Sequence, residues 1–193
     1  MYGVHGEKDL DEVELPHLDG YRSSRPVRIG NGAAEQRQLE VYGELMSTGY
    51  ELMRQKVPMD DRTMRFLART ADKVCEVWEQ PDSGIWERRG EENHYTYSKV
   101  MLWVALDRAA HMAEQYGLEG STERWKEVGD LIADTVLREG YSERRGAFTE
   151  HFGSEALDAA NLRIPLMELL PFEDSRVQGT IDLIVEELLE GGM

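Results

Sequence analysis

Six stretches of this sequence repeat apolar residues at intervals of three or four, and proline or glycine separates most of them. That interval places apolar side chains on one face of an α-helix. The alternation of apolar and polar residues that a half-buried β-strand requires is nowhere sustained for long enough to build a sheet. The helices are predicted at about residues 33–56, 60–80, 96–116, 121–140, 159–170 and 174–190. We therefore expect an all-α fold of about six helices.

The length and composition of the chain are those of one folded domain. With 193 residues the chain can bury a sizeable core. Its 31% of charged and 40% of apolar residues fit a folded protein and not a disordered one. Residues 1–33 show no clean period and are predicted to be irregular. We therefore treat residues 1–193 as a single domain with an irregular N-terminal segment.

The charge balance excludes two classes of partner. The formal net charge is -16, and the sequence pI is about 4.7. A surface this acidic repels phosphate backbones and anionic lipids, so neither nucleic acid nor a membrane is expected as a partner. The acidity fits solubility, a neutral ligand or a high-salt environment, and composition does not separate these explanations.

Targeting and disulfide signals are missing from the sequence. Cys75 is the only cysteine, so an internal disulfide is excluded. No apolar run approaches the roughly 20 residues of a membrane-spanning helix. The N-terminus lacks the basic start and apolar core of a signal peptide. These features predict a cytoplasmic protein.

Metal and cofactor motifs are missing as well. No pair among the five histidines has the spacing of metal ligands on one helix face. The sequence has no Walker loop, no dinucleotide fingerprint and no nucleophile elbow. We therefore expect neither a metal nor a cofactor.

The most informative connection lies between the second and third predicted helices. Pro81, Gly84 and Gly90 keep it from being helical, and it places Glu87 directly after Trp86. An indole that partly shields a carboxylate from water disfavours the charged form and raises the pKa of the carboxyl group. A general acid that protonates a glycosidic oxygen needs such a pKa. The alternative is that Trp86 fills a helix junction and Glu87 is solvated.

A second shaped loop, residues 20–32, concentrates arginine in a chain dominated by acids. Glycine and proline fix its shape. Arg25 and Arg28 on such a loop can offer paired donors to ligand hydroxyls or to a carboxylate. The alternative is that these arginines balance neighbouring acidic residues.

Several stretches, taken in order, resemble one known family. They are Gly20–Arg22, Ser24–Asn31, Leu39–Glu44, Pro81–Gly90, Tyr97–Met101, Ala105–Ala109 and Leu157–Ala159. Together they resemble the glucoamylase-type glycoside hydrolases of family 15, in the branch of prokaryotic glucoamylases, glucodextranases and trehalases. Any one motif would be weak, but the ordered set extends over nearly the whole chain.

The resemblance implies an (α/α)6 barrel, of which this chain would form about half. It also implies hydrolysis of a terminal α-glucosidic bond with inversion, in which one glutamic acid protonates the leaving oxygen and a second carboxylate activates water. Glu87 matches the family's general acid, and Ile85 and Trp86 match residues that line the pocket for the terminal sugar. The expected partner is a di- or oligosaccharide of α-linked glucose, and the sequence does not choose between α-1,4-glucan, dextran and trehalose.

The resemblance places further substrate-binding residues around this pair. The loop from Arg25 to Arg28 resembles the segment at the edge of the leaving-group site, where Tyr21 is the nearest aromatic residue. Arg88, also assigned to substrate binding, stands where fungal members have a second acid, which leaves contacts beyond the first sugar open. Asp158 resembles an aspartate at the rim of the site, although capping of the helix that follows would explain it equally well.

The family's general base and its Trp-x-Arg-Asp sugar-binding segment have no match in this chain. We therefore predict an internal part of a longer catalytic domain, which carries the general acid without the base and is inactive alone. The alternative is a catalytically incomplete acidic helical module that binds carbohydrate or a partner. A half-barrel also leaves apolar helix faces uncovered, so we expect it to self-associate.

Overall fold

The computed structural model describes residues 3–189 and confirms the all-α class. Within these residues the six α-helices are α1 (Glu40–Arg54), α2 (Asp61–Val77), α3 (Thr96–Tyr116), α4 (Thr122–Glu139), α5 (Arg163–Leu166) and α6 (Ser175–Leu188). Two antiparallel strand pairs are very short: β1 (Val13–Glu14) with β2 (Arg28–Ile29), and β3 (Tyr141–Ser142) with β4 (Ala147–Phe148). Two 3-10 turns, η1 (Tyr21–Ser23) and η2 (Ala159–Leu162), complete the set.

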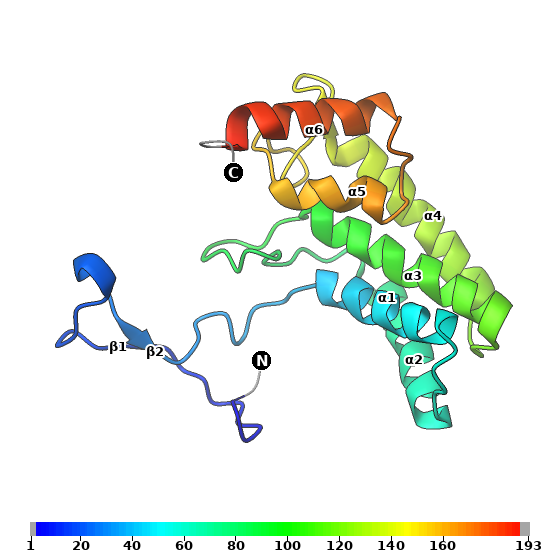
Figure 1. The fold of residues 1–193 in the computed structure, drawn as a ribbon, viewed down its shortest axis with the longest axis horizontal. Helices are drawn as coiled ribbons and strands as arrows, with labels where there is room; N and C mark the ends of the chain where they lie inside the picture. Colours follow the sequence, from blue (N-terminus) through cyan, green and yellow to red (C-terminus); the bar gives the residue numbers. More distant parts are fainter. Residues whose placement is uncertain (1–2, 190–193) are drawn as a thin grey trace.

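The helices are arranged around α3. This helix packs mainly against α1 and α4, while α2 contacts α1, α3 and α4, and α6 lies over η2 and β4. Figure 1 shows the N-terminal segment with β1 and β2 extending away from the helices. The connection between α2 and α3, drawn in green, projects past the start of α3 toward that segment (Figure 1). The α2–α3 connection is therefore presented at one end of the helical body.

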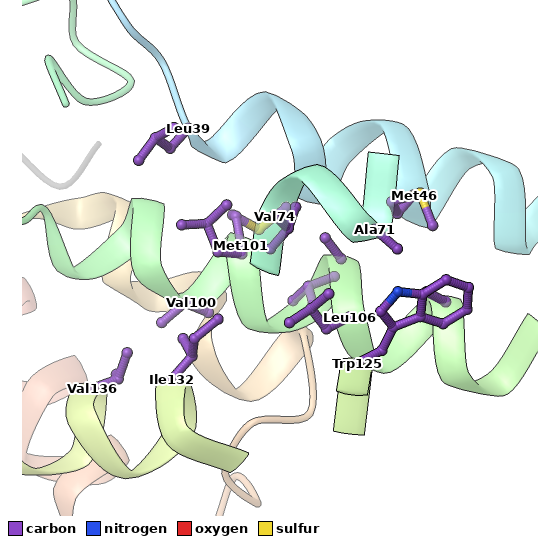
Figure 2. Packing of buried hydrophobic residues seen from close by; sticks show 14 of the residues in the cluster. Leu39, Met46, Ala71, Val74, Val100, Met101, Leu106, Trp125, Ile132 and Val136 are labelled. Atoms are coloured by element: carbon purple, nitrogen blue, oxygen red, sulfur yellow. The ribbon is translucent and has the colours of Figure 1, made fainter. Parts of the chain in front are cut away.

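The hydrophobic core lies where α1, α2, α3 and α4 meet (Figure 2). Buried side chains from all four helices contribute to it, among them Leu39, Met46, Ala71, Val74, Val100, Met101, Leu106, Trp125, Ile132 and Val136. The indole of Trp125 is fully buried, and its Nε1 donates a hydrogen bond of 2.8 Å to Oδ1 of Asp72 on α2. Because the only polar atom of this ring is hydrogen-bonded, burial of the indole stabilises the fold without leaving an unsatisfied polar group.

Glycine allows α1 and α3 to pack closely. A Cβ atom at Gly43 would lie 2.2 Å from the carbonyl oxygen of Met101 on α3, a distance at which real Cβ atoms do not occur. The two backbones therefore touch at this point, and the absence of a side chain on α1 is what permits it. This contact fixes the distance between the two helices whose N-terminal ends flank the α2–α3 connection.

Aspartates begin several helices. Asp60 accepts a hydrogen bond of 2.7 Å from the backbone N of Thr63 at the start of α2. Asp158 and Asp174 accept from the second following backbone N–H, at the starts of η2 and α6. These side chains pair helix-terminal N–H groups that have no partner within the helix.

The structure corrects the prediction in two places. The first helix begins at Glu40 and not at Ala33, because the backbone N of Leu39 is bound by the Asp82 carboxylate, which comes from a distant part of the chain. The predicted helix at 159–170 is shorter and consists of η2 followed by α5, with Glu168 just beyond it in a left-handed conformation (φ 70°). The predicted end of the last helix, near Gly191, lies outside the described residues.

Candidate active site

The connection between α2 and α3 is a closed loop. Its base is an antiparallel bridge in which Asp82 and Asn93 exchange two backbone hydrogen bonds, each 2.9 Å long. The buried carboxylate of Asp82 accepts hydrogen bonds from Ser98 Oγ (2.7 Å) and from the backbone N of Leu39 (3.1 Å). Asp82 therefore joins the loop to the first turn of α3 and to the start of α1.

The carboxyl groups at this base have perturbed pKa values. Burial raises the pKa of Asp82, although its hydrogen bonds from Ser98 and Leu39 oppose the rise. Burial, with a contribution from the charge of Asp82, raises the pKa of Glu40 to about 7. Glu40 is 5% exposed and lies within 3.5 Å of Ser98 Oγ. The base of the loop is thus a buried polar cluster and not a solvated surface.

Lys99 fixes the other side of the loop base. Its Nζ donates hydrogen bonds to the carbonyl oxygens of Trp78 (2.6 Å) and Gln80 (2.5 Å), just after the end of α2. Burial lowers the pKa of the Lys99 amine to about 8. The lysine thereby supplies donors to carbonyl groups that the helix leaves without an intrahelical partner.

The tip of the loop turns through two residues with positive φ. Gly84 has φ 66°, and a Cβ there would lie 2.9 Å from the ring of Tyr95. Glu87 has φ 51°, which is uncommon for a residue that is not glycine. The backbone N of Glu87 donates to the carbonyl oxygen of Gly84 at 3.3 Å. The left-handed backbone at Glu87 makes this residue the turning point of the loop.

The Glu87 side chain lies on the surface of the described structure. The residue is exposed, and one carboxylate oxygen accepts a hydrogen bond of 3.4 Å from Gln38 Nε2. The expectation that Trp86 shields this carboxylate is therefore not met among the described residues. The physical reason is that the indole is directed elsewhere: Trp86 Nε1 donates a hydrogen bond of 2.9 Å to Oδ1 of Asp158.

The residues next to Glu87 have partners on the segment that follows β4. Trp86 remains 57% exposed despite its hydrogen bond, whereas Asp158 is 7% exposed. Arg88 forms an ion pair of 2.5 Å with the carboxylate of Glu150, a residue that is only 4% exposed. The structure thus brings Trp86, Glu87, Arg88 and Asp158 together, and Ile85 lies beside them in the same loop.

Sequence reasoning missed Glu150. Its signal was weak, because Glu150 is one of 38 acidic residues and follows a strand too short to be predicted. Asp82 was likewise recognised only as part of the motif Pro81–Gly90. Its contact with the backbone N of Leu39 could not be predicted, because the two residues are 43 positions apart.

The arginines of the N-terminal segment pair with acids of that same segment. Arg25 forms an ion pair with Asp19, and Arg28 pairs with Glu12 (3.0 Å) and Glu14 (2.9 Å). This is the alternative that the sequence left open for these residues. Tyr21 is 80% exposed.

The N-terminal segment is nevertheless connected to the loop. The guanidinium group of Arg89 donates two hydrogen bonds, of 2.8 and 2.6 Å, to the carboxylate of Glu12. This pairing holds the pKa of Glu12 at about 2. Arg25 and Arg28 also line a shallow hollow of about 370 Å³ with Leu15 and Leu18. The predicted leaving-group loop therefore has a concave surface, and Arg89 joins its strand pair to the loop that bears Glu87.

The fold defines a class of structure, a helical body from which the α2–α3 loop projects. Solved structures of glycosidases share this fold. A wild-type glycosidase has a TM-score of 0.64 at 19% identity and covers 77% of this chain and 39% of its own. A glycosidase variant in complex with glucose has a TM-score of 0.66 at 19% identity, over 78% of this chain and 40% of its own. The helices correspond to part of an (α/α)6 barrel.

The family follows from sequence comparison. The profile of the glycosyl hydrolases family 15 matches residues 1–193, and the chain belongs to that family. It is similar to the trehalase of Mycobacterium tuberculosis (strain ATCC 25618 / H37Rv), with 44% identity over 193 residues, which are 100% of this chain and 28% of the relative. The trehalase of Thermoplasma volcanium is 36% identical over 192 residues, or 31% of its length. The chain thus spans about a third or less of these relatives.

Among residues 3–189, none of the helices combines the length and the apolar character needed to cross a bilayer.

Proposed function

We propose that this chain is the acid-bearing part of a family 15 glycosidase that hydrolyses terminal α-glucosidic bonds with inversion of configuration. Glu87 is the general acid in this proposal, and it protonates the oxygen of the departing sugar. The observation that carries the proposal is the presentation of Glu87 at the turning point of a loop whose base and flanks are fixed by buried carboxylates. Because similar proteins are named trehalases, trehalose is the first substrate to test.

An exposed carboxylate is not yet a good general acid. Protonation of a leaving oxygen near neutral pH requires a raised pKa, which burial provides. Glu87 is exposed among the described residues, so its shielding has to come from the bound sugar and from further chain. The relatives are about three times longer than this chain, which supports further chain as that source.

We assign the general base to the same additional chain. In inverting enzymes the two carboxyl groups stand roughly 6.5–9.5 Å apart, with a water molecule and the sugar between them. In this proposal the 193 residues supply the acid alone, and their rate of hydrolysis without the second carboxylate is lower by orders of magnitude.

The remaining predicted residues surround the acid in this proposal. Ile85 and Trp86 form a wall for the terminal glucose, with the exposed indole face as the stacking surface. The hollow lined by Arg25 and Arg28 faces the leaving group, and Tyr21 of the same segment offers it an exposed aromatic ring. Arg88 lies next to the acid, and the guanidinium N–H groups that do not face Glu150 can donate to sugar hydroxyl groups.

A second candidate is a module that binds carbohydrate without hydrolysing it. The exposure of Glu87 favours it for this chain. Calorimetric titration of the full-length protein with maltose and trehalose distinguishes the two, because binding without release of glucose is expected of the module and not of the glycosidase. Large apolar side chains such as Leu166 (70% exposed) and Phe172 (58%) also support self-association, which light scattering measures.

The experiment for the main proposal compares Glu87→Gln with the unchanged full-length protein. Gln keeps the size and one acceptor oxygen but has no acidic proton to transfer to the leaving oxygen. We expect glucose release from trehalose or maltose to fall by at least about 100-fold, the usual contribution of a general acid. Glu127→Gln, an exposed glutamate on α4, is the matched control and keeps full activity. Unchanged activity in Glu87→Gln removes this residue as the acid.

A further inference from the structure

Two carboxylates from a single segment hold the residues on both sides of Glu87. Asp158 Oδ1 accepts the indole hydrogen bond of Trp86 at 2.9 Å, and Glu150 forms the 2.5 Å ion pair with Arg88. Both carboxylates are nearly buried, whereas the loop that they hold is exposed. Surface loops are generally more mobile than the elements that they connect. Here the loop that bears Glu87 is attached to two nearly buried side chains, Asp158 and Glu150.

Asp158 is fixed by its own backbone and by the cap that it forms. The oxygen that binds Trp86 also accepts a hydrogen bond of 2.8 Å from the backbone N of Ala160, the second residue of η2. One atom thus sets both the start of η2 and the position of the indole. A side chain that is 7% exposed and engaged in two hydrogen bonds has little freedom to rotate toward a sugar.

Glu150 is fixed in the same way by its main chain. Its carbonyl oxygen accepts from the backbone N of Thr96, the first residue of α3, at 2.9 Å. Its own N donates to the carbonyl oxygen of Ala156 at 2.8 Å. The backbone that carries this carboxylate therefore moves only with the start of α3, and the near-complete burial of Glu150 limits rotation of its side chain.

We propose that Asp158 and Glu150 are positioning residues for the general acid: by holding Trp86 and Arg88 they fix the backbone turn that aims the Glu87 carboxylate. This inference rests on the proposed function of Glu87. The Glu87 carboxylate has one long hydrogen bond of 3.4 Å, from Gln38 Nε2, so the contacts of this side chain do not determine where it points. A displacement of about 1 Å of a catalytic group costs up to about 100-fold in rate, which is the size of effect that such anchors prevent.

The first test observes the anchor directly. In a ¹⁵N-labelled sample of the full-length protein, the indole N–H resonance that disappears in Trp86→Phe is the one from Trp86. We expect Asp158→Ala to move the Trp86 resonance upfield and to speed its exchange with water. Asp174→Ala is the matched control, because Asp174 caps α6 with the same spacing and does not contact the loop. An unmoved Trp86 resonance in Asp158→Ala overturns the anchor.

The second test separates positioning from stability, in the full-length protein with trehalose. We expect Asp158→Ala to lower kcat by about 10- to 100-fold with KM changed less than about threefold. The basic limb of the pH–rate profile should also shift, because it reports the pKa of the acid in its new surroundings. Asp158→Asn retains an oxygen that accepts both N–H groups and should restore most of kcat. A loss of folded protein alone would lower kcat without moving the basic limb.

Glu150→Gln is the second variant, for the case in which Asp158→Ala does not fold. It removes the charge that holds Arg88, and we expect a smaller loss of kcat with the same direction of shift in the basic limb. If Glu87→Gln is inactive but the folded anchor variants have the wild-type kcat and pH profile, the positioning role is overturned and the acid role stands. Full activity in Glu87→Gln overturns the acid role itself, and the positioning role with it, whatever the indole resonance shows.

Discussion

Trp86 Nε1 and Asp158 Oδ1 are 2.9 Å apart although 72 residues separate them in the sequence. The hydrogen bond turns the indole toward η2, and this explains why the tryptophan does not cover its neighbour Glu87. Sequence reasoning paired Trp86 with Glu87 as shield and acid. The structure pairs Trp86 with Asp158 and leaves Glu87 exposed.

The base of the loop should be sensitive to the loss of one carboxylate. Asp82→Ala leaves two buried donors, the backbone N of Leu39 and the hydroxyl of Ser98, without their acceptor. An unsatisfied buried donor costs about 1–3 kcal/mol, so we expect the free energy of unfolding to fall by about 2–4 kcal/mol. Urea denaturation measures it. The exposed cap variant Asp60→Ala should cost about 1 kcal/mol, and an equal loss in both would contradict this role of Asp82.

Two helical glycines should respond to alanine with opposite sign. At Gly43 a Cβ would lie 2.2 Å from the Met101 carbonyl oxygen, so Gly43→Ala must push α1 and α3 apart. Overpacking of this kind costs about 1–3 kcal/mol or more. At Gly129 on α4 the nearest atom to a new Cβ is Leu106 Cβ at 3.7 Å, an ordinary contact. Gly129→Ala should therefore stabilise the protein by about 0.5–1 kcal/mol, because alanine favours the helix.

Thermal unfolding measures the stability of both glycine variants. A higher Tm for Gly129→Ala and a lower Tm for Gly43→Ala are expected. A stabilising effect at Gly43 would show that the two helices are farther apart than the structure places them.

The buried Glu40 predicts a dependence of stability on pH. Its folded-state pKa, raised by burial to about 7, exceeds the ordinary value of 4.5, so the folded state binds the proton more tightly than the unfolded state. Stability contributed by the protonated group is therefore present below about pH 4.5 and is lost as pH rises to about 7. Glu40→Gln should remove this part of the slope, whereas Glu127→Gln should leave it. Identical slopes in Glu40→Gln and the unchanged protein would contradict the assignment.

The sequence predicts best what local chemistry decides. The third helix has the predicted bounds, Thr96–Tyr116, because its apolar spacing is continuous and Gly117 ends it in a left-handed conformation. The cap formed by Asp158 was also offered by the sequence, since a cap contacts backbone only two or three residues away. The family, and with it the fold, was predicted from an ordered set of short motifs, and the profile match over residues 1–193 confirms it.

Contacts between distant segments could not be predicted in the same way. The start of α1 depends on Asp82, and the direction of the Trp86 indole depends on Asp158. The role of Glu150 as the ion-pair partner of Arg88 is seen only in the folded structure. In each case the deciding partner lies in another part of the sequence, so no local pattern carries the information. Arg25 and Arg28 are the opposite case. Their acidic partners lie in the same segment, so the sequence already offered pairing with neighbouring acids as an alternative.

The most direct test of the account is the anomer of glucose released in the first turnovers of trehalose, followed by ¹H NMR in the full-length protein and in Glu87→Gln. Inversion gives β-glucose from the attacked residue of trehalose, while the departing residue keeps its α configuration. We predict equal amounts of α- and β-glucose before mutarotation in the unchanged protein, and a rate at least about 100-fold lower in Glu87→Gln. Early release of α-glucose alone, or undiminished release by Glu87→Gln, would contradict the account.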